Sequence, residues 1–289
     1  MKLRPSRAQA LRLLFATAVL ALSASPAFAT SVLYASCAGN TLCIVSPVDG
    51  SLVSTVGSTG LTASVTGLAF DPQTGTLYGS VSPLTGPTGG GSLYSFDLVT
   101  GVATLVGPFG TGIRIPDIAF NAAGTLFGSS RSSGLVYTID LSTGAESVFA
   151  SIGAADTGGN GIELDASGVI QWTRSTTLNA IDGTSGLLLG SLPLTPVVAP
   201  AYTLSALTLD PETGTMFALT HMVVGVATLV TLDTSTGVVT TVGPSAGRDA
   251  IAFQVPEPAL SVLAGIAAIC LIAARRAASG AGDRTISTA

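Results

Sequence analysis

Gly-Leu-Ala-Phe-Asp-Pro-Gln-Thr-Gly-Thr-Leu-Tyr-Gly, residues 67–79, is the stretch that decides the fold, because it returns along the chain. Apolar residues lie on either side of a turn, which is the pattern of two antiparallel strands. Further copies begin at Asp117, Gly161 and Ala206, and a half-copy, Asp249–Phe253, stops after one strand. The apolar residues before the turns are spaced by 50, 44, 45 and 44 positions: Phe70, Phe120, Leu164, Leu209 and Phe253.

A second strand–turn–strand motif alternates with the first at the same period. Its clearest copy is Leu93–Gly107, and the others begin at Leu42, Val136, Leu178 and Leu229. Two hairpins per repeat make a four-stranded sheet, and radial repetition of such sheets forms a propeller. The sequence therefore predicts an all-β fold, a five-bladed β-propeller. We expect Ser31–Ser36 and Asp249–Phe253 to share the closing blade, which removes the edges of the ring.

The aspartates that open the turns are expected to be structural. An aspartate at the first turn position accepts backbone N–H groups, and a glycine three or four residues later takes a positive φ. Seven of the fourteen carboxylates of residues 30–254 fall in this class: Asp71, Asp97, Asp140, Asp165, Asp182, Asp210 and Asp233. The alternating acidic residues of a calcium loop are absent, so the sequence predicts no metal and no other cofactor.

The N-terminus is predicted to be a signal peptide, residues 1–29. Lys2 and three arginines precede an uncharged apolar run from Leu13 to Leu22, and Ala27-Phe28-Ala29 offers a cleavage site. Cleavage is expected after Ala29. The propeller, residues 30–254, would then be exported.

The C-terminal segment, residues 255–276, is predicted to hold a membrane helix. The uncharged run from Ala259 to Ala274 corresponds to a helix of about 24 Å. Arg275 and Arg276 follow it and favour a cytoplasmic C-terminus, with residues 277–289 as a short polar tail. An ordinary single-pass anchor is the simplest interpretation of this segment and predicts the same topology.

The charge of the body excludes one class of partner. Residues 30–254 contain four arginines, no lysine and fourteen carboxylates, so the formal charge is 4 − 14 = −10. Nucleic acids bind to basic stripes, and this body has none. Nucleic-acid binding is therefore not expected.

Cys37 and Cys43 are the two cysteines of the body. Export to an oxidising compartment permits a disulfide between them, and a hairpin with Gly39 and Asn40 in its turn would set them opposite each other. The alternative is two free buried thiols. Neither interpretation is catalytic, since two cysteines and one histidine cannot complete a four-ligand zinc site.

Catalytic motifs are missing from the sequence. His221 is the single histidine and has no G-x-S-x-G nucleophile elbow with it, so it is typical of a surface residue. Trp172 occupies a position where other repeats carry Tyr or Phe, and it is expected to pack in the core. No catalytic residue is predicted.

The mouth of the central channel is the predicted ligand site. Residues just before the innermost strands should ring this mouth, and several of them are charged or polar: Arg114, Asp117, Asp156, Asn160, Arg248 and Asp249. Such a set could orient a small polar ligand. The alternative is that the Arg–Asp pairs tie neighbouring blades together.

The tail, over about the last 35 residues, resembles the PEP-CTERM sorting domain of exported proteins of Gram-negative bacteria. The resemblance rests on Val255, Pro256, Glu257 and Pro258, the apolar run, and the pair Arg275–Arg276. It implies recognition by an exosortase, a membrane-embedded cysteine transpeptidase, and an association with exopolysaccharide and biofilm. The body is similar to bacterial secreted propellers with an Asp-Pro-x-Thr-Gly turn, which implies the fold and no activity.

The predicted function is a non-enzymatic, exported propeller held at the envelope by its tail, serving as a binding or matrix module. Its partners would be the sorting enzyme and extracellular polysaccharide or another envelope protein. Two alternatives stay open. One is a hydrolase or lyase acting at the channel mouth, for example on lactones or glycans, and the other is a purely structural surface protein.

Overall fold

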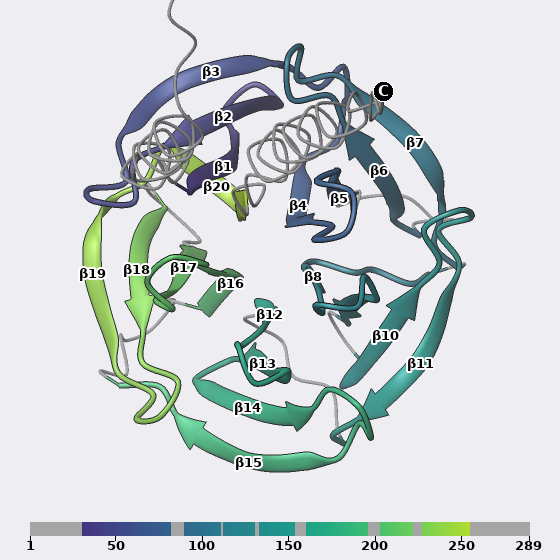
Figure 1. Ribbon diagram of the computed structural model, residues 1–289, viewed down its shortest axis with the longest axis vertical. Helices are drawn as coiled ribbons and strands as arrows, with labels where there is room; N and C mark the ends of the chain where they lie inside the picture. The colour runs from purple at the N-terminus through teal and green to yellow at the C-terminus, as the bar shows by residue number, and fades with distance from the viewer. Residues whose placement is uncertain are drawn as a thin grey trace, which may run out of the picture. The chain divides into compact units, whose positions relative to one another are not determined.

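The computed structural model describes residues 31–81, 90–110, 112–130, 133–153, 160–195, 203–221 and 227–254, apart from the side chains of His221 and Arg248. These residues form five four-stranded antiparallel sheets. The sheets are arranged as blades around a central axis (Figure 1). The described part contains no helix. This arrangement confirms the predicted five-bladed β-propeller.

Each blade has four strands, from an innermost one beside the central axis to an outermost one at the rim (Figure 1). Blade 1 contains β20 (Gly247–Gln254), β1 (Val32–Cys37), β2 (Thr41–Val45) and β3 (Leu52–Ser58). Blade 2 contains β4 (Val65–Phe70), β5 (Leu77–Val81), β6 (Ser92–Phe96) and β7 (Ala103–Pro108). Blade 3 contains β8 (Ile118–Phe120), β9 (Leu126–Ser129), β10 (Leu135–Ile139) and β11 (Glu146–Ser151). Blade 4 contains β12 (Ile162–Leu164), β13 (Val169–Arg174), β14 (Thr177–Asp182) and β15 (Leu188–Pro193). Blade 5 contains β16 (Thr203–Leu209), β17 (Met216–His221), β18 (Thr228–Leu232) and β19 (Val239–Pro244).

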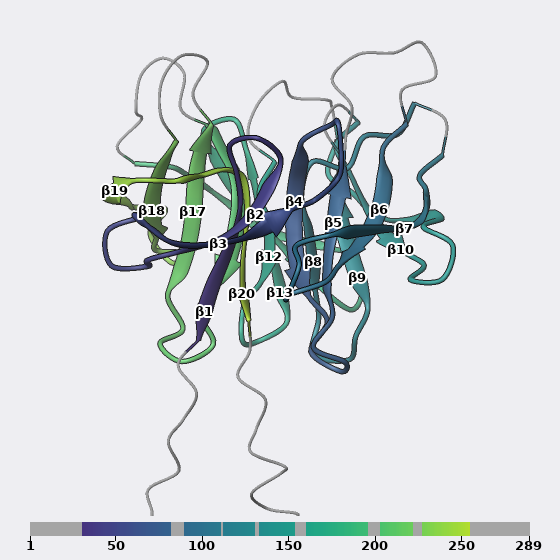
Figure 2. The same ribbon diagram turned by 90° about the horizontal axis from the view of Figure 1, so that it is seen from above.

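Blade 1 is built from both ends of the described chain, as the half-copies of the repeat predict. β20 pairs with β1 in an antiparallel register that places Gln254 opposite Val32 and Ile251 opposite Ala35. We call the face at which β1 begins and β20 ends the terminal face, and the opposite one the distal face. In Figure 2 the start of β1 and the end of β20 lie on the same side of the propeller. The ring is closed by hydrogen bonding between strands that are far apart in sequence.

The turns of both motifs confirm the structural role of the seven aspartates. Asp97 Oδ1 accepts the N–H of Val99 at 2.9 Å and of Thr100 at 2.7 Å. The other six accept N–H or O–H groups of their own turns in the same way. These bonds hold the pKa of Asp140 down to about 2. Because the bonds favour the charged carboxylate, their contribution to stability is present above the usual aspartate pKa and is lost as the pH falls through the lowered one.

The apolar core lies between adjacent blades rather than in one central mass. Aromatic rings of neighbouring blades meet in pairs near the terminal face, for example Tyr34 with Phe70 and Phe217 with Phe253, both at 5.4 Å between ring centroids. Trp172 is 0% exposed and belongs to the cluster between blades 3 and 4. It therefore packs in the core, as predicted.

Glycines bring the outer parts of neighbouring blades into backbone contact. A Cβ placed on Gly107 of blade 2 would collide with the carbonyl of Thr143 in the outer turn of blade 3. Equivalent contacts join the other blades: Gly57 with Gly101, Ala150 with Gly186, Pro193 with Gly237, and Gly243 with Asp49. The last of these connects blade 5 to blade 1. In every blade, the turn of the second motif therefore contacts the outermost strand of the preceding blade.

The cysteine hairpin differs from the prediction in register. Cys37 and Cys43 are joined by a disulfide, with 6.1 Å between their Cα atoms. Residues 38–40 form the turn, so Cys37 pairs with Thr41 and Cys43 pairs with Ala35. The expectation that the cysteines lie directly opposite each other was wrong, because a three-residue turn brings its two flanking residues into register. The bridge instead runs diagonally across the two strands.

Both targeting segments, residues 1–29 and 255–289, lie outside the described residues. Among the residues that the structure describes, no helix has the length and apolar character needed to cross a membrane.

Candidate functional site

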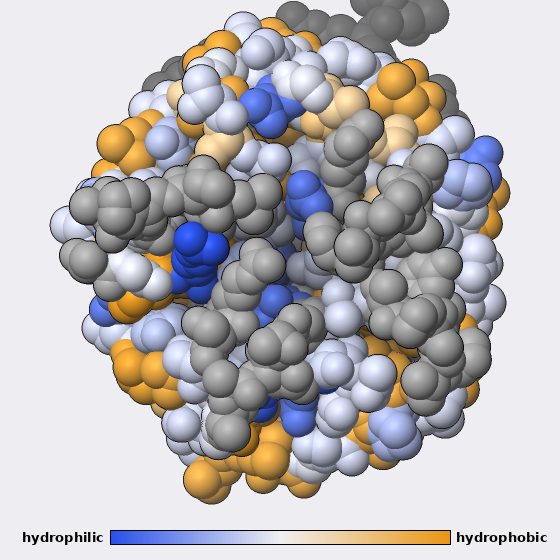
Figure 3. Space-filling model, turned by 180° about the vertical axis from the view of Figure 1, so that it is seen from behind, coloured by the Kyte–Doolittle hydropathy of each residue, from blue (hydrophilic) through white to orange (hydrophobic). Residues whose placement is uncertain are grey.

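The six residues predicted at the channel mouth do not form one solvent-facing cluster in the described part. Asp117 is 0% exposed, so it lies inside the propeller. Arg114, Asn160 and Asp249 are half-buried. Asp156 and the side chain of Arg248 lie outside the described residues, as does the side chain of His221. Hydrophilic side chains do gather around the centre of the distal face, and the apolar ones lie mostly toward its rim (Figure 3).

Asp117 joins blades 3, 4 and 5 through N–H groups of innermost strands. Its Oδ2 accepts the N–H of Ile162 in blade 4 at 2.9 Å and the N–H of Leu207 in blade 5 at 3.1 Å. A side chain on Gly67 of blade 2 would collide with Asp117, so that glycine makes room for it. The inner edge of an innermost strand has no strand neighbour, and its N–H groups therefore need other acceptors. Asp117 supplies one.

The electrostatics of Asp117 are those of a carboxyl taken out of water. Burial raises the pKa of this carboxyl well above its usual value, and the backbone hydrogen bonds oppose the change. Its Oδ1 has no hydrogen-bond partner among the described residues. Asp117 thus acts as a structural acceptor within the channel rather than as an exposed ligand-binding group.

Glu163 is a second channel carboxyl, in the middle of β12 and directly after Ile162. Its Oε1 accepts the N–H of Leu164 at 2.8 Å, and its Oε2 accepts the N–H of Leu209 in blade 5 at 3.3 Å. The Thr208 side chain bonds to it as well and accepts the N–H of Phe253 in blade 1 at 3.1 Å. Burial raises the pKa of Glu163 to about 8, against these hydrogen bonds. This carboxyl is therefore mostly protonated at neutral pH.

A cavity of about 270 Å³ opens beside Glu163 on the terminal face. Its wall contains the last apolar residue of the innermost strand of every blade: Phe70, Phe120, Leu164, Leu209 and Phe253. Such a cavity can enclose a small apolar group, and a neutral carboxyl at its edge can donate one hydrogen bond. Carboxyls with a strongly raised pKa in a cavity are typical of functional sites. This mouth is the candidate functional site.

Glu163 was not among the residues predicted to form a site, although the repeat contains a signal for it. The residue before the last apolar position is Ala69, Ala119, Glu163, Thr208 and Ala252 in the successive copies. A carboxyl at a position where three copies carry alanine departs from the repeat. That departure indicates either a ligand or a special structural contact.

The two channel carboxyls predict that stability falls as the pH rises. Between the unfolded pKa of 4.5 and the folded pKa of about 8, the folded state holds a proton at Glu163 that the unfolded state has lost. The free energy of unfolding should then drop by about 4 kcal/mol between about pH 5 and pH 9. Urea unfolding across this range measures it.

The matched variant is Glu163→Gln, which removes the titrating group. Its unfolding free energy should vary less with pH than that of the wild type over the same range, and the remaining slope should come from Asp117. Equal slopes in the two proteins would contradict the assignment to Glu163.

Groups of three or more His, Cys, Asp or Glu placed to hold a metal ion are absent from the described residues. A further depression, of about 860 Å³, lies between the turns of blades 4 and 5 and is lined mainly by polar turn residues such as Ser167, Thr234 and Thr236.

Comparison with known proteins shows similarity to solved structures only. No family model and no curated protein matches the chain. Glutaminyl cyclase from Myxococcus xanthus superposes with a TM-score of 0.45 at 17% identity, over 66% of this chain and 70% of that one. A protein of unknown function from Bacteroides caccae gives 0.49 at 12% identity, over 78% and 99%. TolB from Acinetobacter baumannii gives 0.45 at 16% identity, over 84% and 61%.

Proposed function

We propose that the chain is an exported, non-enzymatic propeller that serves as a binding or matrix module of the cell envelope. The observation that carries this proposal is the cavity at the channel mouth, where the carboxyl of Glu163 stands beside a ring of apolar strand ends. A small ligand with an apolar part and one hydrogen-bonding group fits this chemistry. The disulfide between Cys37 and Cys43 supports export, because such bridges persist in oxidising compartments.

The sequence of the tail supports a location for the protein at the cell envelope. A signal peptide at residues 1–29 would bring it across the inner membrane, and the motif Val255–Pro258 with the run after it would hold it there. An exosortase would be the partner that acts on the motif. Extracellular polysaccharide or another envelope protein would be the partner of the propeller.

Intact mass and fractionation test the proposed processing. We expect the wild-type protein to end near Val255–Pro258 and to leave the inner membrane. A variant with Pro256, Glu257 and Pro258 changed to alanine should keep its full C-terminus and stay in the membrane fraction. A wild-type mass running from Thr30 to Ala289 in the inner membrane would show a plain anchor, and the link to biofilm would be dropped.

One observation favours a second function, a hydrolase or lyase acting at the channel mouth. A carboxyl with a pKa near 8 is a suitable proton donor at neutral pH. If the protein is such an enzyme, turnover of a lactone or glycan should be lost in Glu163→Gln. Binding without turnover by the wild type would instead support the binding module.

A further inference from the structure

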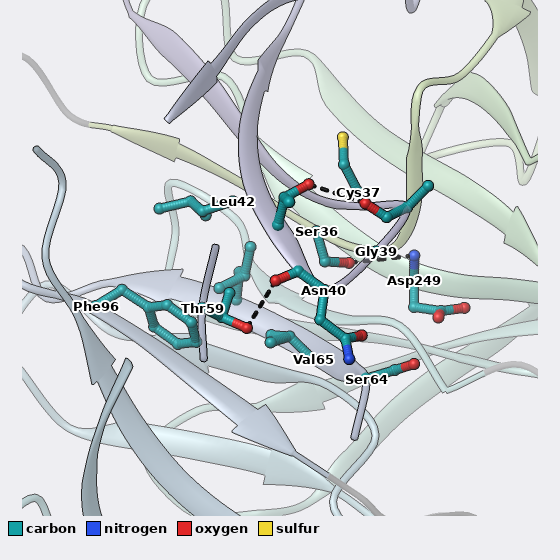
Figure 4. A pocket seen from close by; sticks show the side chains of 13 residues that line it. Ser36, Cys37, Gly39, Asn40, Leu42, Thr59, Ser64, Val65, Phe96 and Asp249 are labelled. Carbon is teal, nitrogen blue, oxygen red and sulfur yellow. Dashed lines mark hydrogen bonds between the residues drawn. The ribbon is translucent and has the colours of Figure 1, made fainter. Parts of the chain in front are cut away.

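Buried side-chain atoms without a hydrogen-bond partner are few in the described part of the chain. They are Asp117 Oδ1, Gln171 Oε1 and Trp172 Nε1. Around the cavity of about 150 Å³ between blades 1 and 2, by contrast, polar groups bond to one another. There the Thr59 hydroxyl donates to the carbonyl of Asn40 at 2.8 Å (Figure 4). An unpaired acceptor in the interior is costly, so the oxygen of Gln171 needs a donor.

Gln171 belongs to a pair of residues that sets blade 4 apart. In the other four blades, a small residue of the innermost strand lies opposite an aromatic residue of the second strand: Ala252 and Tyr34, Ala69 and Tyr78, Ala119 and Phe127, and Thr208 and Phe217. In blade 4 these two positions carry Glu163 and Gln171. Gln171, rather than Trp172, thus occupies the aromatic position of the repeat. Two polar residues that face each other at exchanged positions indicate a joint role.

The orientation of the Gln171 amide follows from its other contact. Its Nε2 donates to Asp165 Oδ2 at 2.9 Å. Burial works to raise the pKa of Asp165, but hydrogen bonds from Ser167, Gln171 and Val169 outweigh it and lower this pKa. Asp165 is therefore ionised at neutral pH and only accepts hydrogen bonds. The amide atom beside it must be the nitrogen, so the atom without a partner is the oxygen.

Glu163 is the neighbour that can supply the missing hydrogen. Directly opposite residues on paired strands share one face of the sheet, with Cβ atoms about 4.5–5.5 Å apart. Ala180, which lies opposite Gln171 on β14, has no polar side chain. Burial raises the pKa of Glu163 to about 8, so its carboxyl carries a hydrogen at neutral pH. The N–H groups of Leu164 and Leu209 donate to this carboxyl and leave its hydrogen unused.

Thr208 completes the count of hydrogens. Its Oγ1 accepts the N–H of Phe253 at 3.1 Å, and its side chain bonds to Glu163. Glu163 and Thr208 have two side-chain hydrogens and one mutual bond, so one hydrogen is left over. If Thr208 donates to Glu163, the hydrogen left over is that of the carboxyl. Gln171 Oε1 is the acceptor that lacks one, and this arrangement satisfies all three side chains.

We propose that Gln171 is the positioning residue of the channel-mouth carboxyl, with its side-chain oxygen accepting the hydrogen of Glu163. This bond holds the carboxyl against β13, while Thr208 and Leu209 hold it from blade 5. When the hydrogen is lost, two acceptors face each other and the carboxyl is released from Gln171. The cavity wall then has a neutral form and an ionised form, so ligand binding there depends on pH. The inference rests on the proposed function in placing the ligand at this mouth.

The other charged groups near the pair provide a control. β12 packs against β8, β13 and β16. The charged residues on these strands or beside their ends are Asp117, Asp165, Arg174 and Asp210. Asp165 and Asp210 bond to their own turns, and Arg174 stacks on the ring of Trp172 at 5.1 Å. Burial, and to a smaller extent the charge of Glu163, raises the pKa of Asp117, so a titration must separate these two carboxyls.

The first test is carbon NMR of the full-length protein in detergent, labelled with carbon-13 at the side-chain carbonyl of glutamine. The chain has four glutamines, Gln9, Gln73, Gln171 and Gln254, and Gln171→Leu identifies the signal of interest by removing it. This signal should shift with pH around a midpoint of about 8. The shift should be lost in Glu163→Leu and kept in Asp117→Asn. A Gln171 signal that does not move, or that moves equally in Glu163→Leu, would overturn the proposal.

Melting temperatures at neutral pH provide the second test. In Glu163→Gln the new amide can still donate to Gln171, whereas in Glu163→Leu nothing can. Glu163→Leu should therefore melt at a lower temperature than Glu163→Gln, and the difference should disappear when both also carry Gln171→Leu. An equal difference in the two backgrounds would contradict the pairing. Neither test uses a ligand, so a mouth that binds nothing would count against the proposed function alone.

Discussion

Deletion of residues 250–254 is expected to abolish the cooperative unfolding transition of the propeller. Ala250, Ile251, Ala252 and Phe253 are at most 4% exposed. Their loss would open the inner edge of β1 and expose the apolar clusters on both sides of blade 1. Burial of a large apolar side chain is worth about 1.5–3 kcal/mol, and the ring would also lose its closure. Circular dichroism during heating should show a broad, non-cooperative change.

A circular permutant provides the control for this deletion. Gln254 and Val32 are neighbours in the sheet, so a short Gly-Ser linker can place Gly247–Gln254 in front of Ser31. This permutant keeps every strand pair and should unfold cooperatively. A sharp transition in the deletion variant, at the wild-type temperature, would show that ring closure through β20 is not needed.

Substitution of Gly107 by alanine should cause the largest loss of stability among single changes in the outer part of the blades. The new Cβ would collide with the backbone carbonyl of Thr143 in the next blade, and a backbone atom cannot rotate away as a side chain can. Overpacking of this kind costs about 3 kcal/mol. For a domain of this size the melting temperature should fall by about 6–12 °C.

Gly190→Ala is the matched control, because a Cβ there meets nothing within 4 Å. It lies in β15, an outermost strand like β7, so it reports the general effect of alanine at such a position. Calorimetric melting of both variants measures the difference. Equal melting temperatures would show that the blades can move apart at Gly107 without cost.

The repeat in the sequence was enough to predict the blade number and the closing blade, because both depend on periodicity alone. The turn aspartates were predictable for the same reason, since each acts within a few residues of its own position. The core position of Trp172 was predictable from the apolar residues at the same place in other copies.

The channel was harder to predict, because its chemistry depends on contacts between blades. Asp117 precedes an innermost strand, and nothing in its local sequence says that its carboxyl turns inward to N–H groups of two other blades. The raised pKa of Glu163 arises from burial, which a strand pattern does not measure. The diagonal disulfide depends on turn register, and one residue more or less in the turn would change it.

The closing strand also determines how the molecule responds to a mechanical load. A pull on the chain beyond Gln254 reaches the propeller through β20, whose pairing with β1 runs from Gln254 and Val32 to Gly247 and Cys37. Tension directed along this strand shears several ladder hydrogen bonds together instead of breaking them one after another. Once they yield, the innermost strand leaves and the ring opens. The β20–β1 pairing that closes the ring is thus also the place where a tethered propeller would begin to unfold under force.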